Sequence, residues 1–252
     1  MTDLTKKSEQ ECSSKLNRTH LKYIAIVAML LDHIGMVFGQ YFMDSVAGAI
    51  VYNCFRVLGR LTAPIMCFFL SQGFLYTRSR KKYAIRLAVF AVISQVPYAL
   101  AHHHSLLEPD FNMLFVLLIC FGMLCVWESK LAVFPKTLVL LVLICLSAFC
   151  DWGLFAPLLV LFFHVFRENR RKIIISYSIL VVVVVAVSCV FLVSKGLMWY
   201  RELWQLGLFL FIPVLFLYNG QPGPQNAFNK WFFYIFYPAH LLILWAIYSM
   251  NM

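Results

Sequence analysis

Long apolar stretches alternate with short polar connections along the chain from residue 21 to its end. A helix of about 20 mostly apolar residues crosses roughly 30 Å of hydrocarbon, and most of these stretches approach that length. The pattern therefore predicts an all-α, polytopic bundle of about nine transmembrane helices. The expected spans are residues 21–43, 55–76, 83–101, 111–127, 132–150, 153–166, 173–194, 203–219 and 231–250.

The composition supports a membrane protein. Hydrophobic residues make up 62% of the chain and charged residues 13%, whereas soluble domains are roughly half apolar and a quarter charged. The net charge of +10 would also suit a nucleic-acid-binding protein. In a chain this apolar, however, an excess of Lys and Arg is typical of cytoplasmic loops. We expect the lipid bilayer as a partner and no nucleic acid.

The basic residues lie at alternate ends of the expected spans. Cytoplasmic loops carry the excess of Lys and Arg, so the alternation predicts a cytoplasmic N-terminus and an outer C-terminus. Residues 1–20 are then a polar cytoplasmic tail without a signal peptide, and residues 21–252 are a single transmembrane domain. The basic residues at the cytoplasmic ends are Lys6, Lys7, Lys15, Arg18, Lys22, Arg78, Arg80, Lys81, Lys82, Lys130, Arg167, Arg170, Arg171, Lys172 and Lys230.

Asp32 and His33 are adjacent in the middle of the first expected span. An aspartate near the bilayer midplane costs on the order of 2.5–3.5 kcal/mol, so ionisable residues at this depth usually face a bundle interior or a wet cavity. His33 is therefore a candidate general base and Asp32 its candidate partner. The alternative is a polar pair that only packs helices together. Lys22 lies on the same helix face, at the cytoplasmic mouth, where it could hold an anionic group.

Arg56 and Arg60 open the second expected span, four residues apart and hence on one helix face. They could snorkel to the outer interface, or they could neutralise Asp32. They could also hold an acidic acceptor or a developing oxyanion. The sequence leaves these roles open.

A second group of basic residues follows the second span and enters the third. These side chains could receive a phosphorylated donor such as a coenzyme A nucleotide. Solvated loops that only set the topology would contain the same residues. The group comprises Arg78, Lys81, Lys82 and Arg86.

Few other polar residues lie within the spans. His240, in the ninth span, comes at a depth close to that of His33. The two histidines could share a site, or His240 could hydrogen-bond carbonyls freed by Pro238. Asn112 and Asp151 lie at the ends of spans and are candidate substrate contacts.

The sequence does not favour a metal site. The triplet His102 to His104 falls in an expected outer loop, where a solvated cluster is more common than a metal centre. None of the eight cysteines has the spacing of a metal-binding motif. We therefore expect no metal.

The chain contains, in order, LKYIAIVAMLLDHIGMVF, FRVLGRLTAPIMCFFLSQGFLYTRSRKKYAIRLAVFAVISQVPYAL, FNMLFVLL, DWG and YIFYPAHLLIL. Together these segments resemble the TraX family, whose namesake is linked to N-acetylation of conjugative pilin. The likeness is specific at DHIG, GRL-x-x-P and YP-x-H. The segments are more faintly similar to the type-3 membrane acyltransferases, in which an arginine and a histidine separated by ten residues occupy the first helix. Lys22 and His33 hold these places here.

This resemblance implies an acetyltransferase in the cytoplasmic (inner) membrane of a bacterium. Acetyl-coenzyme A from the cytoplasm would be the co-substrate, and an amine or hydroxyl of a pilin-like peptide, glycan or lipid would accept the acetyl group at the outer side. His33 would be the general base, and Asp32 its orienter or an electrostatic partner. The expected acceptor contacts are Arg56, Arg60, His240, Asn112 and Asp151, and the expected donor contacts are Lys22, Arg78, Lys81, Lys82 and Arg86.

A proton-coupled transporter is the alternative function, because it would place the same ionisable residues at the midplane. Transporters of this kind are often built from inverted repeats with paired broken helices. The sequence contains no convincing repeat. We therefore favour the transferase.

Overall fold

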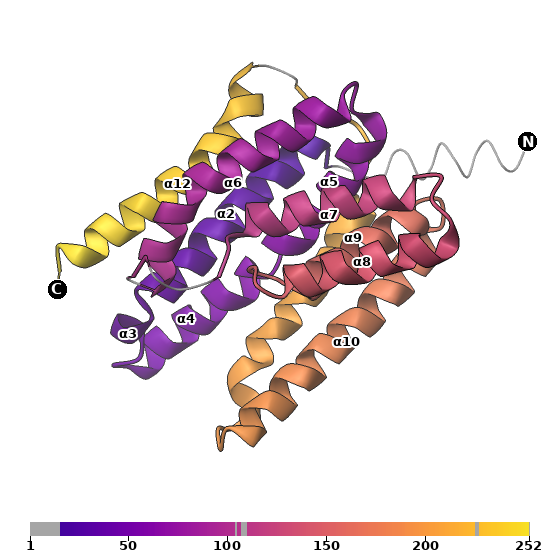
Figure 1. Cartoon of the computed structure of the whole chain (residues 1–252). Helices are drawn as coiled ribbons and strands as arrows, with labels where there is room; N and C mark the ends of the chain where they lie inside the picture. Colours follow the sequence, from indigo (N-terminus) through magenta and orange to yellow (C-terminus); the bar gives the residue numbers. More distant parts are fainter. Residues whose placement is uncertain (1–15, 104, 107–109, 225–226, 252) are drawn as a thin grey trace, which may run out of the picture.

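The computed structural model describes residues 16–103, 105–106, 110–224 and 227–251. Within these ranges the chain is helical, with two isolated β-bridges and no longer strand (Figure 1). The elements are α2 (Arg18–Val37), α3 (Gly39–Phe42), α4 (Val46–Gly59), α5 (Thr62–Tyr76), α6 (Arg80–His103), α7 (Met113–Trp127), α8 (Val133–Ser147), α9 (Phe155–Val165), α10 (Arg170–Ser194), η1 (Trp199–Leu210), α11 (Phe211–Leu217) and α12 (Ala227–Ser249).

Within the described residues, six helical segments are long and apolar enough to cross a membrane. The other three expected spans are the shorter helices α7, α8 and α9, of 15, 15 and 11 residues. The all-helical bundle is thus confirmed for the described residues, while the count of nine crossings and the cytoplasmic N-terminus stay predictions. The six segments are Arg18–Val37, Val46–Tyr76, Arg80–His103, Arg170–Ser194, Trp199–Leu217 and Trp231–Ser249.

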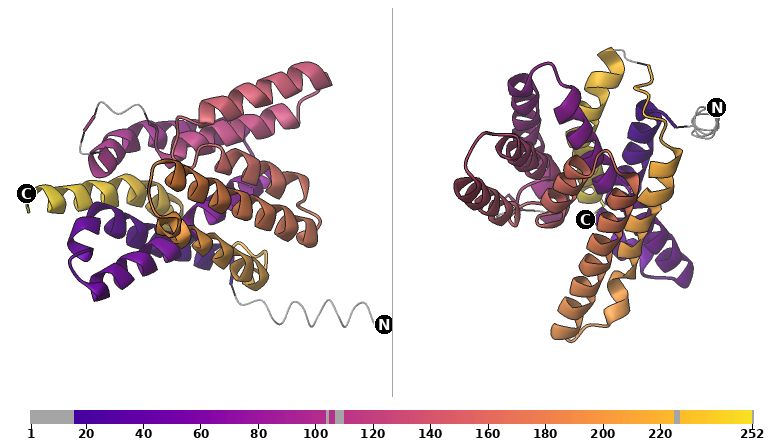
Figure 2. Two further views of the ribbon diagram at one scale, coloured as in Figure 1. Left: turned by 90° about the horizontal axis from the view of Figure 1, so that it is seen from below. Right: turned by 90° about the vertical axis from the view of Figure 1, so that its right-hand side faces the viewer.

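Helices α2 and α12, which are far apart in the sequence, pack against each other. Helix α2 contacts α4, α5 and α12, and α12 also packs along α6. Helix α5 contacts α9 and α7, while η1 joins α4 to α10. Figures 1 and 2 show α8 at the periphery beside α7.

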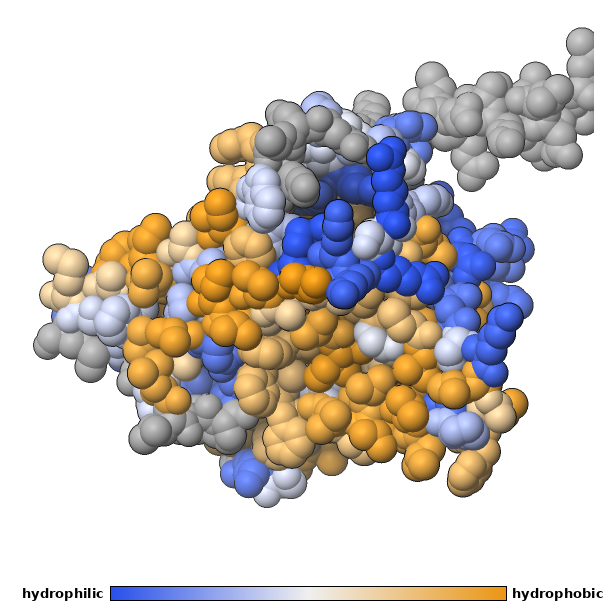
Figure 3. Space-filling model, turned by 45° about the horizontal axis from the view of Figure 1, so that its top comes forward, coloured by the Kyte–Doolittle hydropathy of each residue, from blue (hydrophilic) through white to orange (hydrophobic). Residues whose placement is uncertain are grey.

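The peripheral helices turn apolar side chains outward. On α8, Phe134 is 80% exposed, and on α10, Val190 is 70% exposed. In Figure 3 hydrophobic side chains cover most of the visible face, and hydrophilic side chains gather in its upper part. An apolar belt with polar ends is the surface that a bilayer requires.

Helix α4, which contains Arg56 and ends just before Arg60, begins earlier than the sequence predicts. Residues 44–54 were expected to be a loop, but α4 starts at Val46 behind the capping hydroxyl of Ser45, because the residues that follow are mostly apolar. Helices α4 and α5 form one 31-residue segment, interrupted around Arg60 and Leu61. Arg56 and Arg60 therefore lie near the middle of this segment and not at its outer end.

Two further boundaries differ from the expected ones. Residues 18–20, assigned to the polar tail, form the first turn of α2 because the Asn17 side chain accepts a hydrogen bond from the backbone N–H of His20. His102 and His103, assigned to an outer loop, form the last turn of α6. His104 and residues 1–15 lie outside the described residues.

Candidate functional site

His33 and His240 meet at the contact between α2 and α12. The Nδ1 atom of His33 lies 2.7 Å from Nε2 of His240, and Nδ1 of His240 lies 2.7 Å from the carbonyl oxygen of Phe236. A carbonyl only accepts, so neutral His240 donates from Nδ1 and accepts at Nε2. His33 must then donate from Nδ1, which leaves its lone pair on Nε2. His240 thus contacts His33 and, in addition, donates to a carbonyl of its own helix.

The Asp32 carboxylate binds both arginines. Arg56 Nη1 donates to Oδ1 at 2.8 Å, and Arg60 Nη2 donates to Oδ2 at 2.7 Å and to Oδ1 at 2.9 Å. A Cβ atom at Gly59 would overlap the Asp32 side chain, so the close approach of α4 requires glycine there. His240 orients His33, while Asp32 is the electrostatic partner of the arginines.

Two tryptophans that the sequence analysis did not assign to the site cover these arginines. The Trp204 ring lies 4.3 Å from the guanidinium carbon of Arg56 and 4.5 Å from that of Arg60. The Trp152 ring lies 4.7 Å from the guanidinium carbon of Arg60. Such contacts stabilise a desolvated cation by about 1–2 kcal/mol. Trp152 belongs to the DWG segment of the family resemblance, which could have pointed to it as a site residue. Nothing in the sequence singled out Trp204.

The backbone at Trp152 is strained. Its φ of 60° is in the left-handed region, and it is the only non-glycine residue of the described chain with a positive φ. A bulky residue there costs about 1–2 kcal/mol. Strain of this kind is concentrated at functional sites, and here it holds the indole against Arg60.

A cavity of about 160 Å³, which we call the His33 chamber, lies among these groups. Asp151 also lines it, from the connection between α8 and α9. Burial raises the pKa of the Asp151 carboxyl to about 6, although the nearby Arg60 opposes the shift. The charged and ring-bearing residues of its lining are Asp32, His33, Arg56, Arg60, His102, Asp151, Trp152 and Tyr237.

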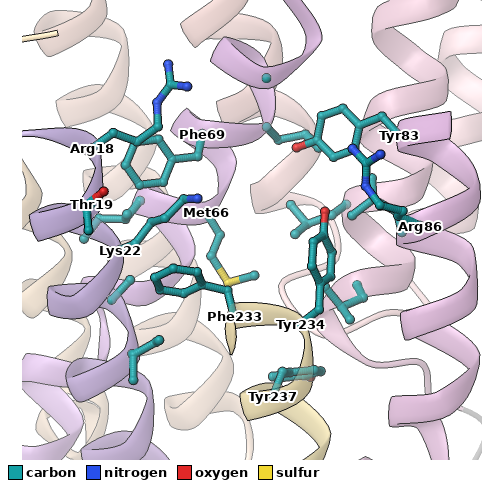
Figure 4. A pocket seen from close by; sticks show the side chains of 18 of the residues that line it. Arg18, Thr19, Lys22, Met66, Phe69, Tyr83, Arg86, Phe233, Tyr234 and Tyr237 are labelled. Atoms are coloured by element: carbon teal, nitrogen blue, oxygen red, sulfur yellow. The ribbon is translucent and has the colours of Figure 1, made fainter. Parts of the chain in front are cut away.

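A larger cavity of about 650 Å³, the basic cavity, opens at the end of the bundle where α2 and α6 begin. Arg18 and Lys22 approach it from α2 and Arg86 from α6, and Figure 4 shows these cations around its upper part. The Lys22 Nζ atom lies 4.8 Å from the centre of the Phe233 ring. Cations at the mouth and an apolar interior suit a ligand with an anionic head and a long neutral arm.

The expected donor contacts divide into two groups. Lys22 and Arg86 line the basic cavity, and Arg18 joins them. Arg78, Lys81 and Lys82 lie around the start of α6, but they do not line the cavity. The positions of these basic residues in the sequence therefore did not show which of them surround the opening of the basic cavity.

The two cavities meet at a common wall. Four residues line both: Met29 of α2, Thr62 and Met66 of α5, and Tyr237 of α12. Lys22, Met29 and His33 follow one face of α2 from the basic cavity to the chamber. At about 1.5 Å per residue, the separation from Lys22 to His33 is roughly 16 Å along the helix.

Asn112 lies outside both cavities. Its side-chain oxygen accepts from the backbone N–H of Leu114 and so caps α7, while its amide nitrogen donates to Ala91 and Gln95 of α6. These bonds give Asn112 a structural role in joining two helices. Among the described residues, no group of three or more His, Cys, Asp or Glu side chains is arranged to hold a metal ion.

Residues 17–248 match the sequence pattern of the TraX protein family. The chain belongs to the TraX protein family. The probable fimbrial assembly protein FimC, serogroup H1, of Dichelobacter nodosus is 32% identical over 236 residues, which cover 89% of this chain and 92% of the relative. No solved structure matches the chain.

The segments on which the TraX resemblance rests converge on the His33 chamber. DHIG supplies Asp32 and His33, and GRL-x-x-P supplies Arg60. YP-x-H supplies Tyr237 to the lining, while its His240 lies behind His33 and does not line the chamber. DWG supplies Asp151 and Trp152. The TraX family resemblance is confirmed, and its most specific segments, far apart in the sequence, form one site.

Proposed function

We propose that this member of the TraX protein family transfers an acetyl group from acetyl-coenzyme A to an acceptor amine or hydroxyl. The observation that carries the proposal is that a basic cavity adjoins a chamber lined by His33, whose Nδ1 atom contacts His240. The basic cavity has cations and an apolar interior for the donor, and the chamber contains the candidate base. The fimbrial assembly name of the relative makes a pilin-like peptide one candidate acceptor.

The donor would lie along α2. Arg18, Lys22 and Arg86 would bind the phosphates of coenzyme A at the mouth, where cations favour an anionic group. The neutral pantetheine arm would then pass between the apolar side chains of the basic cavity towards the common wall. This arrangement brings the thioester near His33, roughly 16 Å below Lys22 along α2.

His33 would act as the general base. The acceptor loses its proton to Nε2 of His33, its nucleophilic atom bonds to the acetyl carbonyl carbon, and the carbon–sulfur bond breaks. Protonated His33 then returns the proton to the coenzyme A thiolate. Arg60 uses Nη2 to bind Asp32, so its other N–H groups are available to a developing oxyanion in the chamber.

The acceptor would enter from the opposite end of the bundle to the basic cavity. His102, in the last turn of α6, and Asp151 line the chamber on that side. With a cytoplasmic N-terminus, as the distribution of basic residues predicts, the donor side is cytoplasmic and the acceptor side is outside. The location that follows is the cytoplasmic membrane of a bacterium.

Radiolabelled acetyl-coenzyme A and the purified protein in liposomes test the proposal, with membranes of source cells added to supply an acceptor. We expect labelled product and free coenzyme A in equal amounts. His33→Ala should lower turnover by roughly 10²–10⁴-fold while coenzyme A still binds. His20→Ala, at an exposed position on the same helix, is the matched control. Proton-driven solute uptake without coenzyme A release would instead identify a transporter.

A further inference from the structure

We infer that the common wall of the two cavities, and Met66 above all, sets the length of the acyl group that this protein accepts. The inference rests on the proposed acyl transfer and adds a specificity-determining residue to it. The wall consists of Met29, Thr62, Met66 and Tyr237, which are the residues that line both cavities.

The wall lies one helical turn from the paired histidines on two helices. Met29 precedes His33 by four residues on α2, and Tyr237 precedes His240 by three residues on α12. A donor that enters from the basic cavity therefore passes the wall just before its thioester reaches His33. The part of the acyl chain beyond the carbonyl must then either fit in the chamber or fold back and pack against the side chains of the common wall.

The chamber favours a short acyl group. Its volume of about 160 Å³ must also admit the nucleophilic end of the acceptor. The Asp32 carboxylate and the guanidinium groups of Arg56 and Arg60 form part of its surface. A longer hydrocarbon chain would displace water from these charged groups without replacing its hydrogen bonds, which is unfavourable.

Met66 is the wall residue best suited to control this passage. Thr62 donates a hydrogen bond to the carbonyl of Ala25, and the side chains of Met29 and Tyr237 are buried. Met66 is half-buried, and in Figure 4 its thioether projects into the basic cavity above Tyr237. A methionine side chain is unbranched and has no strong hydrogen bond to lose, so its truncation widens the passage with little other change.

The test compares the release of free coenzyme A from acetyl-, butyryl- and hexanoyl-coenzyme A by the full-length protein in liposomes with source-cell membranes. The wild-type protein should prefer acetyl-coenzyme A. Met66→Ala should raise the ratio of kcat/KM for hexanoyl- to acetyl-coenzyme A at least tenfold, since each methylene that gains an apolar contact contributes up to about fourfold. Met123→Ala, which truncates a fully buried methionine that lines neither cavity, should leave the ratio unchanged.

Met66→Phe tests the same passage in the opposite direction. The larger ring should narrow it and lower the ratio for butyryl- to acetyl-coenzyme A, and this variant serves alone if Met66→Ala does not accumulate in the membrane. Unchanged ratios in a variant that still turns over acetyl-coenzyme A would overturn the role of Met66. Failure of the wild-type protein to release coenzyme A from any of the three donors would overturn the proposed function itself.

Discussion

The Nδ1 atom of His33 lies 2.7 Å from the Nε2 atom of His240, although 207 positions separate the two residues in the sequence. The contact joins α2 and α12. The Phe236 carbonyl determines which ring nitrogen of His240 carries the hydrogen, and so it also determines which nitrogen of His33 does. The tautomer of the candidate base is thus fixed by a helix at the other end of the chain.

His240 should act as a positioning residue. His240→Leu removes the acceptor for the Nδ1 hydrogen of His33, so we expect turnover to fall roughly 10–100-fold, by analogy with the loss of hydrogen-bonding partners of metal-binding histidines. His240→Gln places an amide oxygen near the same point and should recover part of the activity. Coenzyme A release gives the rates, and equal losses in both variants would contradict an orienting role.

Asp32→Asn should destabilise the protein. The change leaves Arg56 and Arg60, whose side chains are 14% and 7% exposed, without a counter-ion. Breaking a buried pair by removing one partner costs about 3–5 kcal/mol, so the yield of folded protein and its melting temperature in detergent should fall. Asp32→Asn combined with Arg56→Gln and Arg60→Gln removes all three charges and should recover folding but not turnover. A triple variant as unstable as Asp32→Asn would argue against these ion pairs.

Two substitutions of Trp152 can separate the effect of its backbone strain from the effect of its contact with Arg60. Trp152→Ala and Trp152→Gly both lose the indole that covers Arg60. Only glycine adopts the φ of 60° without strain, so the glycine variant should be more stable than the alanine variant by about 1–2 kcal/mol. Thermal unfolding of the two variants measures the difference. Both should turn over acetyl-coenzyme A more slowly than the wild-type protein.

Two sets of substitutions separate donor binding from topology. Arg18, Lys22 and Arg86 line the basic cavity, so their joint replacement by glutamine should raise KM for acetyl-coenzyme A more than it lowers kcat. The matched control replaces the nearby cations that do not line the cavity, namely Arg78, Lys81 and Lys82. The control should bind coenzyme A normally. Equal losses of affinity in both sets would show that net charge, and not the cavity, attracts the donor.

The orientation can be tested with single cysteines at positions 81 and 197, introduced after replacement of the eight native cysteines. The positive-inside distribution predicts that a membrane-impermeant thiol reagent labels position 197 from outside. Position 81 should react only after the cells are opened. Reaction of both positions in intact cells would contradict the nine-span topology.

The sequence by itself determined the class of the protein and the position of Asp32 and His33 in the middle of the first apolar stretch. The length of an apolar stretch and the presence of Asp32 and His33 in its middle are local properties, so they follow from the order of residues alone. The family also followed from short segments such as DHIG and YP-x-H. The pairing of Asp32 with the arginines was among the possibilities that the sequence left open.

The tertiary structure decided how these parts meet. Whether Asp32 contacts His33 or Arg60 depends on how α2 is rotated against α4, and the interruption around Arg60 sets the depth of both arginines. Trp204 reaches the site because Gly207 lets η1 approach the backbone of Val57, a contact between segments far apart in the sequence. Hydrophobic patterning says which face of a helix is buried but not which neighbour buries it, so only the packed bundle could place His240 beside His33.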